Sequence, residues 1–177
     1  MKKIKLGNGF DADTEMGPVI STEHRNKIES YMDVAKAEGA TIAVGGKRPD
    51  RDDLKDGLFF EPTVITNCDT SMRIVQEEVF GPVVTVEGFE TEQEAIQLAN
   101  DSIYGLAGAV FSKDIGKAQR VANKLKLGTV WINDFHPYFA QAPWGGYKQS
   151  GIGRELGKEG LEEYLSLIHI SEPTRPY

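Results

Sequence analysis

The sequence predicts an α/β fold, in which a mostly parallel sheet is flanked by helices. Two segments, residues 106–111 and 129–132, are apolar on both faces, as strands are when helices cover both sides of their sheet. Between them, residues 114–126 place apolar side chains on one helical stripe, namely Ile115, Ala118, Ala122 and Leu125. Because a strand, a helix and a strand follow one another, we expect parallel pairing through a right-handed crossover.

The first half of the chain predicts further short elements. Strands are expected over residues 41–44 and 83–86. Residues 59–66 are β-branched and aromatic, but Pro62 cannot donate a ladder hydrogen bond, which predicts an edge or bulged strand. Residues 22–38 should form an amphipathic helix, because apolar side chains recur at helical spacing at Ile28, Tyr31, Met32 and Ala35.

A capping box marks the start of another helix. The Thr91 hydroxyl and the Glu94 carboxylate have the spacing with which such a pair satisfies the first amides of a helix. We expect this helix to end near residue 101, with inward-facing side chains at Ala95, Leu98 and Ala99.

Composition and charge limit the classes of function. The 177 residues are 40% hydrophobic and 27% charged, as in an ordinary globular domain. The net charge of -7 and the scattered cations argue against nucleic acid and anionic membranes as partners. No apolar run approaches the roughly 20 residues of a membrane span, and no signal core follows the N-terminus. With Cys68 as the single cysteine, we expect no internal disulfide and a cytoplasmic protein.

A glycine-rich stretch over residues 143–155 is the strongest candidate for a site. It combines four glycines, two aromatic rings, two cations and one carboxylate, a mixture typical of a ligand-binding loop. The alternative is a tight double turn that closes a sheet. The glycines at 151, 153 and 157 have the wrong spacing for a dinucleotide fingerprint, and no strand precedes them.

Aromatic residues gather just before and within this stretch. Rings in a loop can form a cage for a quaternary ammonium group through cation–π attraction. The alternative, of equal weight, is that these rings pack a large surface loop. His136 alone cannot make a zinc site, and no second cluster of metal ligands exists in the sequence. We therefore expect His136 to line a pocket. The rings are Phe135, Tyr138, Phe139 and Trp144.

Two further candidates lie in the first half of the chain. Cys68 has no neighbouring histidine or cation to lower its pKa, and Asp69 would raise it, which argues against a nucleophile. Glu77 and Glu78 precede Phe80 and a Gly-Pro turn. A carboxylate there could bind a sugar diol and the ring could pack on a heterocycle, whereas the alternative for both glutamates is a solvated helix end.

Four motifs in order resemble the NAD(P)-dependent aldehyde dehydrogenase superfamily. They are residues 78–83, 104–108, 128–133 and 143–155, and the similarity, to the C-terminal third of that family, runs over residues 1–164. The resemblance implies an oxidoreductase and part of a catalytic domain, with the cofactor domain absent. Within the superfamily, the sequence over 133–138 and 142–146 is similar to members that oxidise betaine aldehyde to the osmoprotectant glycine betaine.

The resemblance also implies roles for single residues on the cofactor and metal side. Glu78 would hydrogen-bond the nicotinamide-side ribose of NAD, or of NADP, and Phe80 would pack near the nicotinamide ring. The backbone carbonyls of Lys148 and Gly151 match positions that hold a potassium ion in some betaine enzymes.

On the substrate side, the resemblance places Trp144, Tyr138 and His136 in the pocket of a small-molecule aldehyde, facing its trimethylammonium group. Glu155 matches a carboxylate that relays protons. In this family a cysteine adds to the aldehyde, hydride passes to NAD, and an activated water hydrolyses the thioester. The family's cysteine and general base precede this segment, so we expect the isolated chain to be inactive.

The end of the chain departs from the family pattern. Residues 166–177 resemble a translated transposon-end adapter from a sequencing library, and we expect a non-native tail over residues 165–177 in place of the oligomerisation arm. The parent enzyme is expected to be a homo-oligomer, a dimer or a tetramer.

Two alternatives to a betaine aldehyde enzyme remain open. One is a dehydrogenase for another amino- or aliphatic aldehyde. The other is a noncatalytic binding or interaction module that retains the fold.

Overall fold

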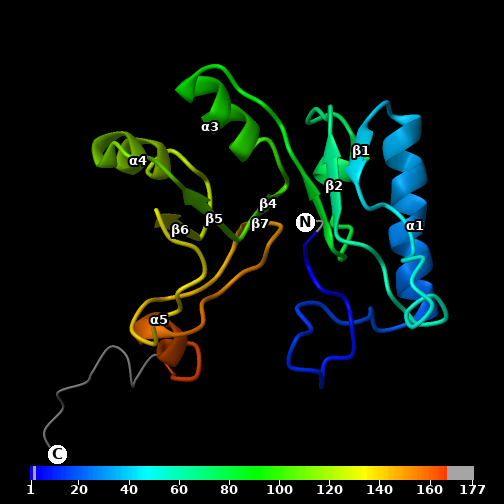
Figure 1. The fold of residues 1–177 in the computed structure, drawn as a ribbon. Helices are drawn as coiled ribbons and strands as arrows, with labels where there is room; N and C mark the ends of the chain where they lie inside the picture. The colour runs from blue at the N-terminus through cyan, green and yellow to red at the C-terminus, as the bar shows by residue number, and fades with distance from the viewer. Residues whose placement is uncertain (2, 167–177) are drawn as a thin grey trace, which may run out of the picture. The chain divides into compact units, whose positions relative to one another are not determined.

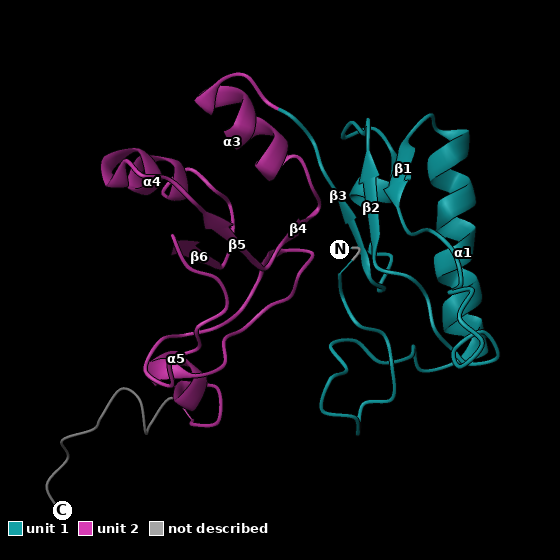
Figure 2. Cartoon of the chain, viewed as in Figure 1, with its two compact units in different colours: residues 1–88 teal, residues 89–177 magenta. Residues whose placement is uncertain are grey.

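The structure is a computed structural model that describes residue 1 and residues 3–166 of the chain. The chain divides into two compact units, residues 1–88 and residues 89–177 (Figure 2). The predicted tail falls, from residue 167 onward, outside the described residues. Within the described part, no helix combines the length and the apolar character that a membrane crossing requires.

Unit 1 is a three-stranded sheet with one long helix packed along it (Figure 1). The strand order is β1-β2-β3, with β1 antiparallel to β2 and β2 parallel to β3. The elements are α1 (Thr22–Ala37), β1 (Thr41–Val44), β2 (Thr63–Thr66), α2 (Arg73–Gln76) and β3 (Val83–Thr85).

The core of unit 1 lies between α1 and the sheet. The predicted stripe of α1 is confirmed, because Ile28, Met32 and Ala35 are buried and Tyr31 is partly buried against them. These side chains meet Phe60 and Ile65, which are also buried. The helix begins where the Ser21 hydroxyl accepts a hydrogen bond from the His24 amide at 3.1 Å.

Of the two alternatives predicted for residues 59–66, the edge strand is wrong, whereas the pairing with β1 does shift register between Ile42 and Val44, as at a bulge. The strand β2 begins at Thr63, after Pro62, and lies in the centre of the sheet. Pro62 lies outside the paired residues, so its lack of an amide hydrogen removes no hydrogen bond between the strands. The Thr63 amide donates to the Pro82 carbonyl at 2.8 Å.

Over its described residues, unit 2 is built from two separate pairs of strands and three helices. The parallel pair β5 and β6 aligns Ala107 with Thr129 and Val110 with Ile132, and α4 lies between these strands in the sequence. This confirms the predicted strand–helix–strand unit. The elements are α3 (Glu92–Asn100), β4 (Tyr104–Gly105), β5 (Ala107–Val110), α4 (Ile115–Ala122), β6 (Thr129–Ile132), β7 (Tyr147–Lys148) and α5 (Gly157–Glu162).

The α/β class is confirmed, but the sheet differs in detail from the predicted one. In place of one mostly parallel sheet, the described residues form three small sheets, in which β1/β2 and β4/β7 are antiparallel. The β4/β7 pair joins residues 104–105 to the glycine-rich stretch. The two-residue strands β4 and β7 are too short to show an alternating pattern in the sequence.

Two helices of unit 2 differ from the prediction in detail. In α3 the Thr91 hydroxyl accepts from the Glu94 amide at 3.1 Å, as predicted, but Ile96 is the buried residue and Ala99 is exposed. The helix α4 ends at Ala122, short of the predicted stripe residue Leu125.

Candidate functional site

The glycine-rich stretch folds back on itself at its two ends. The Trp144 amide donates to the Glu155 carbonyl and the Glu155 amide donates to the Trp144 carbonyl, both at 2.7 Å. Between them, β7 pairs with β4, with Tyr104 opposite Lys148. The stretch therefore closes a small sheet, as one interpretation predicted, and also brings Trp144 and Glu155 together.

Glycine is required where this loop packs on its own backbone. A Cβ at Gly145 would lie 2.5 Å from the Gly153 carbonyl oxygen, closer than side-chain carbons approach. Gly153 has a φ of 85°, which favours glycine. Arg154 ties the loop further, since its guanidinium donates to the carbonyl of Gly146 at 3.1 Å and lies 5.2 Å from the centroid of the Tyr147 ring.

A cavity of about 350 Å³ opens beside this loop. Trp144 and Glu155 both line it, together with Leu106, Arg154 and Glu163. The structure thus places the predicted substrate-side ring and the predicted proton-relay carboxylate on one cavity. His136 and Tyr138 do not line it.

The predicted aromatic cluster forms around a ring that the sequence did not single out. Trp131, on β6, is 9% exposed and lies 5.8 Å from Trp144 and 6.5 Å from Tyr138, measured between ring centroids. Its indole nitrogen donates to the Pro137 carbonyl at 3.2 Å, which fixes the loop that carries the other rings. Its position in an apolar strand made Trp131 look like core, and only its ring neighbours mark it as the base of the cluster.

Tyr138 and Trp144 are the closest pair that could face a cation. Their ring centroids are 4.8 Å apart with an interplanar angle of 69°, and His136 lies 5.2 Å from Tyr138. The centroid of the Phe135 ring lies 4.8 Å from that of His136 and 5.5 Å from that of Trp131. Phe139 is 61% exposed and makes none of the ring contacts of the cluster, so its predicted place in the cage is wrong.

The two residues predicted to hold potassium lie on the turn around β7. The Lys148 ammonium donates to the carbonyls of Asn100 and Ser102 at 3.0 and 2.9 Å, so its side chain anchors the loop. Lys148 and Gly151 have φ values of 53° and 135°. Across the described residues, no group of three or more histidine, cysteine or acidic side chains could hold a metal ion. A potassium site made of backbone carbonyls stays a prediction.

In unit 1, the segment after α2 presents Glu78 and Phe80 to the surface. Val79 between them is buried in the core, whereas Phe80 is 69% exposed and Glu78 is also exposed. Phe80 has a φ of 56°, an uncommon conformation for a side chain of this size. A carboxylate and a ring on this segment fit a ribose and a nicotinamide in chemistry.

Glu77, next to them, is held within the fold. Its carboxylate accepts from the Arg73 guanidinium at 2.8 Å and from the Tyr31 hydroxyl at 2.9 Å. These hydrogen bonds, with Arg73 first, lower the pKa of Glu77 to about 2. Of the two adjacent glutamates, Glu77 therefore closes the end of α2 and Glu78 remains available to a ligand.

Cys68 has the character that the sequence predicted. Burial raises the pKa of its thiol, and the nearby carboxylates of Glu87 and Asp69 raise it further. The predicted direction is confirmed, although burial rather than Asp69 is the main cause. A thiol in this environment is a poor nucleophile.

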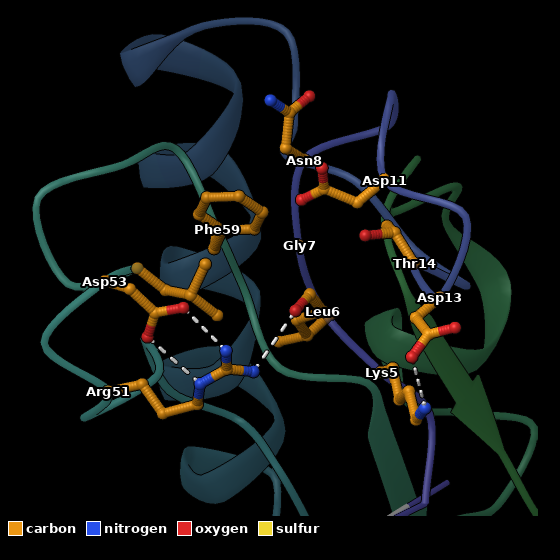
Figure 3. Close-up of a pocket in the computed structure, with 11 residues that line it drawn as sticks. Lys5, Leu6, Gly7, Asn8, Asp11, Asp13, Thr14, Arg51, Asp53 and Phe59 are labelled. Carbon is orange, nitrogen blue, oxygen red and sulfur yellow. Dashed lines mark hydrogen bonds and ion pairs between the residues drawn. The ribbon is translucent and has the colours of Figure 1, made fainter.

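A second, larger cavity of about 630 Å³ lies under the N-terminal loop, and Figure 3 shows its lining. Four of its charged side chains form two pairs. The Lys5 ammonium lies 3.2 Å from the Asp13 carboxylate, and the Arg51 guanidinium binds Asp53 at 2.6 Å and the Leu6 carbonyl at 3.2 Å. These two pairs leave the Asp11 carboxylate, and one carboxylate alone does not define a ligand.

Comparison with known proteins identifies the family. The sequence model of the aldehyde dehydrogenase family matches residues 1–170. The chain belongs to this family. The family consists of NAD(P)-dependent oxidoreductases, and the α/β units described above are part of its fold.

Several relatives are named as betaine aldehyde dehydrogenases. The chain is 66% identical to the one from Bacillus subtilis (strain 168) over 99% of its own length and 36% of the relative. It is 52% identical to the chloroplastic one from Atriplex hortensis and 49% identical to the peroxisomal aminoaldehyde dehydrogenase 2 from Pisum sativum, covering 34% of each. The chain thus spans about a third of the relatives it matches. That it corresponds to their C-terminal third is not confirmed and stays a prediction.

Solved structures of this family also match the chain. The crystal structure of betaine aldehyde dehydrogenase from Staphylococcus aureus in complex with NAD⁺ matches with 99% identity and a TM-score of 0.91, over 93% of this chain and 33% of that one. Other structures of that enzyme carry substitutions at consecutive histidine, proline and tyrosine residues, and its cysteine is BME-modified in some of them.

Proposed function

We propose that this chain is a segment of an NAD-dependent betaine aldehyde dehydrogenase, which oxidises betaine aldehyde to glycine betaine. The observation that carries the proposal is the aromatic cluster. The ring centroids of Tyr138 and Trp144 lie 4.8 Å apart in an edge-to-face arrangement, next to the buried Trp131. Such rings attract a trimethylammonium group by cation–π interaction, without the hydrogen bonds that this group cannot make.

We place the segment after the nucleophilic cysteine of the parent chain, at its C-terminal end. His136, Pro137 and Tyr138 form the single His-Pro-Tyr sequence of this chain and match the consecutive residues substituted in the Staphylococcus aureus enzyme. In the sequence of that enzyme, more residues separate the BME-modified cysteine from this triplet than separate residue 1 of this chain from His136. The counterpart of that cysteine would then precede this chain, which supports the prediction that the isolated chain is inactive.

Glu78 and Phe80 would form the cofactor side of the site. NAD supplies the hydride acceptor of the reaction when it is bound. The exposed Glu78 carboxylate would accept hydrogen bonds from ribose hydroxyls, and the exposed Phe80 ring would pack against the nicotinamide. The NAD⁺ complex of the Staphylococcus aureus enzyme supports NAD as the cofactor.

Glu155 would relay protons at the substrate side, where it shares a cavity with Trp144. The backbone carbonyls of Lys148 and Gly151 would hold potassium on the turn around β7, as carbonyl oxygens do in other potassium sites. We further propose that the parent enzyme is a cytoplasmic homo-oligomer that makes glycine betaine as an osmoprotectant.

An aminoaldehyde is the second candidate substrate. The 49% identity to an aminoaldehyde dehydrogenase of Pisum sativum favours it, because an ammonium group also binds aromatic faces. A trimethylammonium group is larger and cannot donate hydrogen bonds, so it needs a wider pocket lined by rings. An ammonium group would in addition need hydrogen-bond acceptors.

A chimeric enzyme tests the proposal. In it, the matched 93% of this chain replaces its counterpart in the full-length Staphylococcus aureus enzyme. NADH formation is measured with betaine aldehyde, an aminoaldehyde without methyl groups, and an aliphatic aldehyde. We expect the highest kcat/KM with betaine aldehyde, and no NADH from the isolated 177-residue chain. A higher kcat/KM for either other aldehyde would contradict the proposed substrate, and turnover by the isolated chain would contradict the missing nucleophile.

A further inference from the structure

We propose that His24 is a positioning residue for the cofactor-binding segment, and that it sets the affinity for NAD by holding the backbone of Phe80. This inference rests on the proposed function, because Phe80 is proposed there to pack against the nicotinamide. His24 is a half-buried polar residue in the first turn of α1.

The first observation is a direct bond between α1 and Phe80. The His24 ring nitrogen Nε2 contacts the Phe80 carbonyl oxygen. The centroids of the His24 and Phe80 rings lie 5.8 Å apart. A carbonyl oxygen can only accept, so Nε2 carries the proton and donates. Nδ1 is buried and has no hydrogen-bond partner within the described residues, so Nε2 is the ring nitrogen that ties His24 to another segment.

The second observation is that Phe80 needs such support. Its φ of 56° is unfavourable for a residue with a large side chain, and surrounding contacts must hold it. Phe80 is 69% exposed and its ring contacts that of His24, so burial of the side chain supplies little of this support. The backbone carbonyl is therefore where the fold can fix this conformation.

The third observation is that the residues on both sides of Phe80 are also fixed against α1. Val79 is buried in the core that contains Ile28 and Met32. A Cβ at Gly81 would lie 2.6 Å from the Ile28 Cδ1 atom, so this glycine lets the backbone lie directly on the helix. His24 and Ile28 are one turn apart on α1 and together hold the turn that presents the Phe80 ring.

The position of His24 is itself fixed. Its amide donates to the Ser21 hydroxyl at 3.1 Å, in the cap that starts α1. The cap therefore fixes the backbone position from which the imidazole reaches Phe80. Loss of the His24 Nε2 donor would leave α1 in place and would remove the hydrogen bond that holds the Phe80 carbonyl. NAD would then bind to a segment that samples other conformations, at the cost of ordering it.

The test uses the chimeric enzyme with His24→Leu, which removes the donor, and His24→Gln, whose amide nitrogen reaches the position of Nε2. Asn26→Leu, an exposed position on the same helix, is the matched control. We measure the Kd for NAD by direct titration, kcat, and the KM for betaine aldehyde. We expect His24→Leu to raise the Kd for NAD about two- to tenfold, the range of one lost hydrogen bond. The KM for betaine aldehyde should be unchanged, and His24→Gln should recover most of the NAD affinity.

Three results would overturn the inference. They are an unchanged Kd in His24→Leu, a glutamine variant as weak as the leucine variant, or an equal rise of the KM for betaine aldehyde. If leucine prevents folding, His24→Asn replaces it, because its shorter amide cannot reach the Phe80 carbonyl. A parent chimera that binds NAD but does not oxidise betaine aldehyde would contradict the proposed substrate alone, and the NAD titration would still test His24. A parent that does not bind NAD would overturn both.

Discussion

Trp144 and Glu155 exchange two backbone hydrogen bonds of 2.7 Å, which join the two ends of the glycine-rich loop. The bonds involve only main-chain atoms, so the indole and the carboxylate stay available to the cavity that both residues line. Substitution of either side chain should therefore leave the loop closed. Effects of such variants on turnover can then be assigned to the side chains.

Replacing Trp144 by alanine in the chimeric enzyme should weaken binding of betaine aldehyde. Loss of one cation–π partner of about 0.5–2 kcal/mol predicts a rise in KM of roughly two- to thirtyfold. Initial rates at varied aldehyde concentration measure it. Phe139→Ala is the control, since that exposed ring lies outside the cluster and should change KM by less than about twofold. Equal effects of the two variants would argue against the cage.

Replacing Glu155 by glutamine should lower kcat and leave the KM for betaine aldehyde unchanged. The amide keeps the size of the side chain and cannot relay a proton at neutral pH. We expect a loss of roughly tenfold, below the 10²–10⁴ of a direct general acid or base. Steady-state kinetics give both constants. A rise in KM without a fall in kcat would instead assign Glu155 to substrate binding.

The Glu77 pair with Arg73 and Tyr31 predicts a pH-dependent stability. The pKa of Glu77 is lowered from 4.5 to about 2, so the ionised carboxylate stabilises the fold above pH 4.5, and this contribution is lost as the pH falls toward 2. At pH 7, Glu77→Gln should unfold at a lower temperature than the wild type. The difference should shrink between pH 4.5 and about 2, as circular dichroism of the 177-residue chain would measure. A difference that is constant over this range would contradict the assignment.

Replacing Gly81 by alanine should destabilise unit 1. The new Cβ would lie 2.6 Å from the Cδ1 atom and 2.8 Å from the Cγ1 atom of the fully buried Ile28, so this side chain would have to shift within the core. Overpacking of this kind costs about 1–3 kcal/mol in the free energy of unfolding. Urea unfolding measures it. Gly88→Ala is the matched control, because nothing lies within 4 Å of its added carbon and its stability should change by less than about 0.5 kcal/mol.

The sequence by itself determined the elements with a strong local signal. The stripe of α1, the cap at Thr91 and the β5–α4–β6 unit follow from spacing and from side-chain chemistry that act within a few residues. The motifs around Glu78 and Trp144 were also sufficient to predict the family that the comparisons identified.

Tertiary structure decided what depends on residues far apart in the chain. The central place of β2, the pairing of β4 with β7, and Trp131 beneath the ring cluster arise from partners that no local pattern specifies. The same holds for His24, which lies 56 positions from the Phe80 carbonyl it contacts. A polar residue on a helix surface looks the same in the sequence whether it faces water or another segment. Only the packing of unit 1 distinguishes the two, because it brings the Phe80 carbonyl to the imidazole.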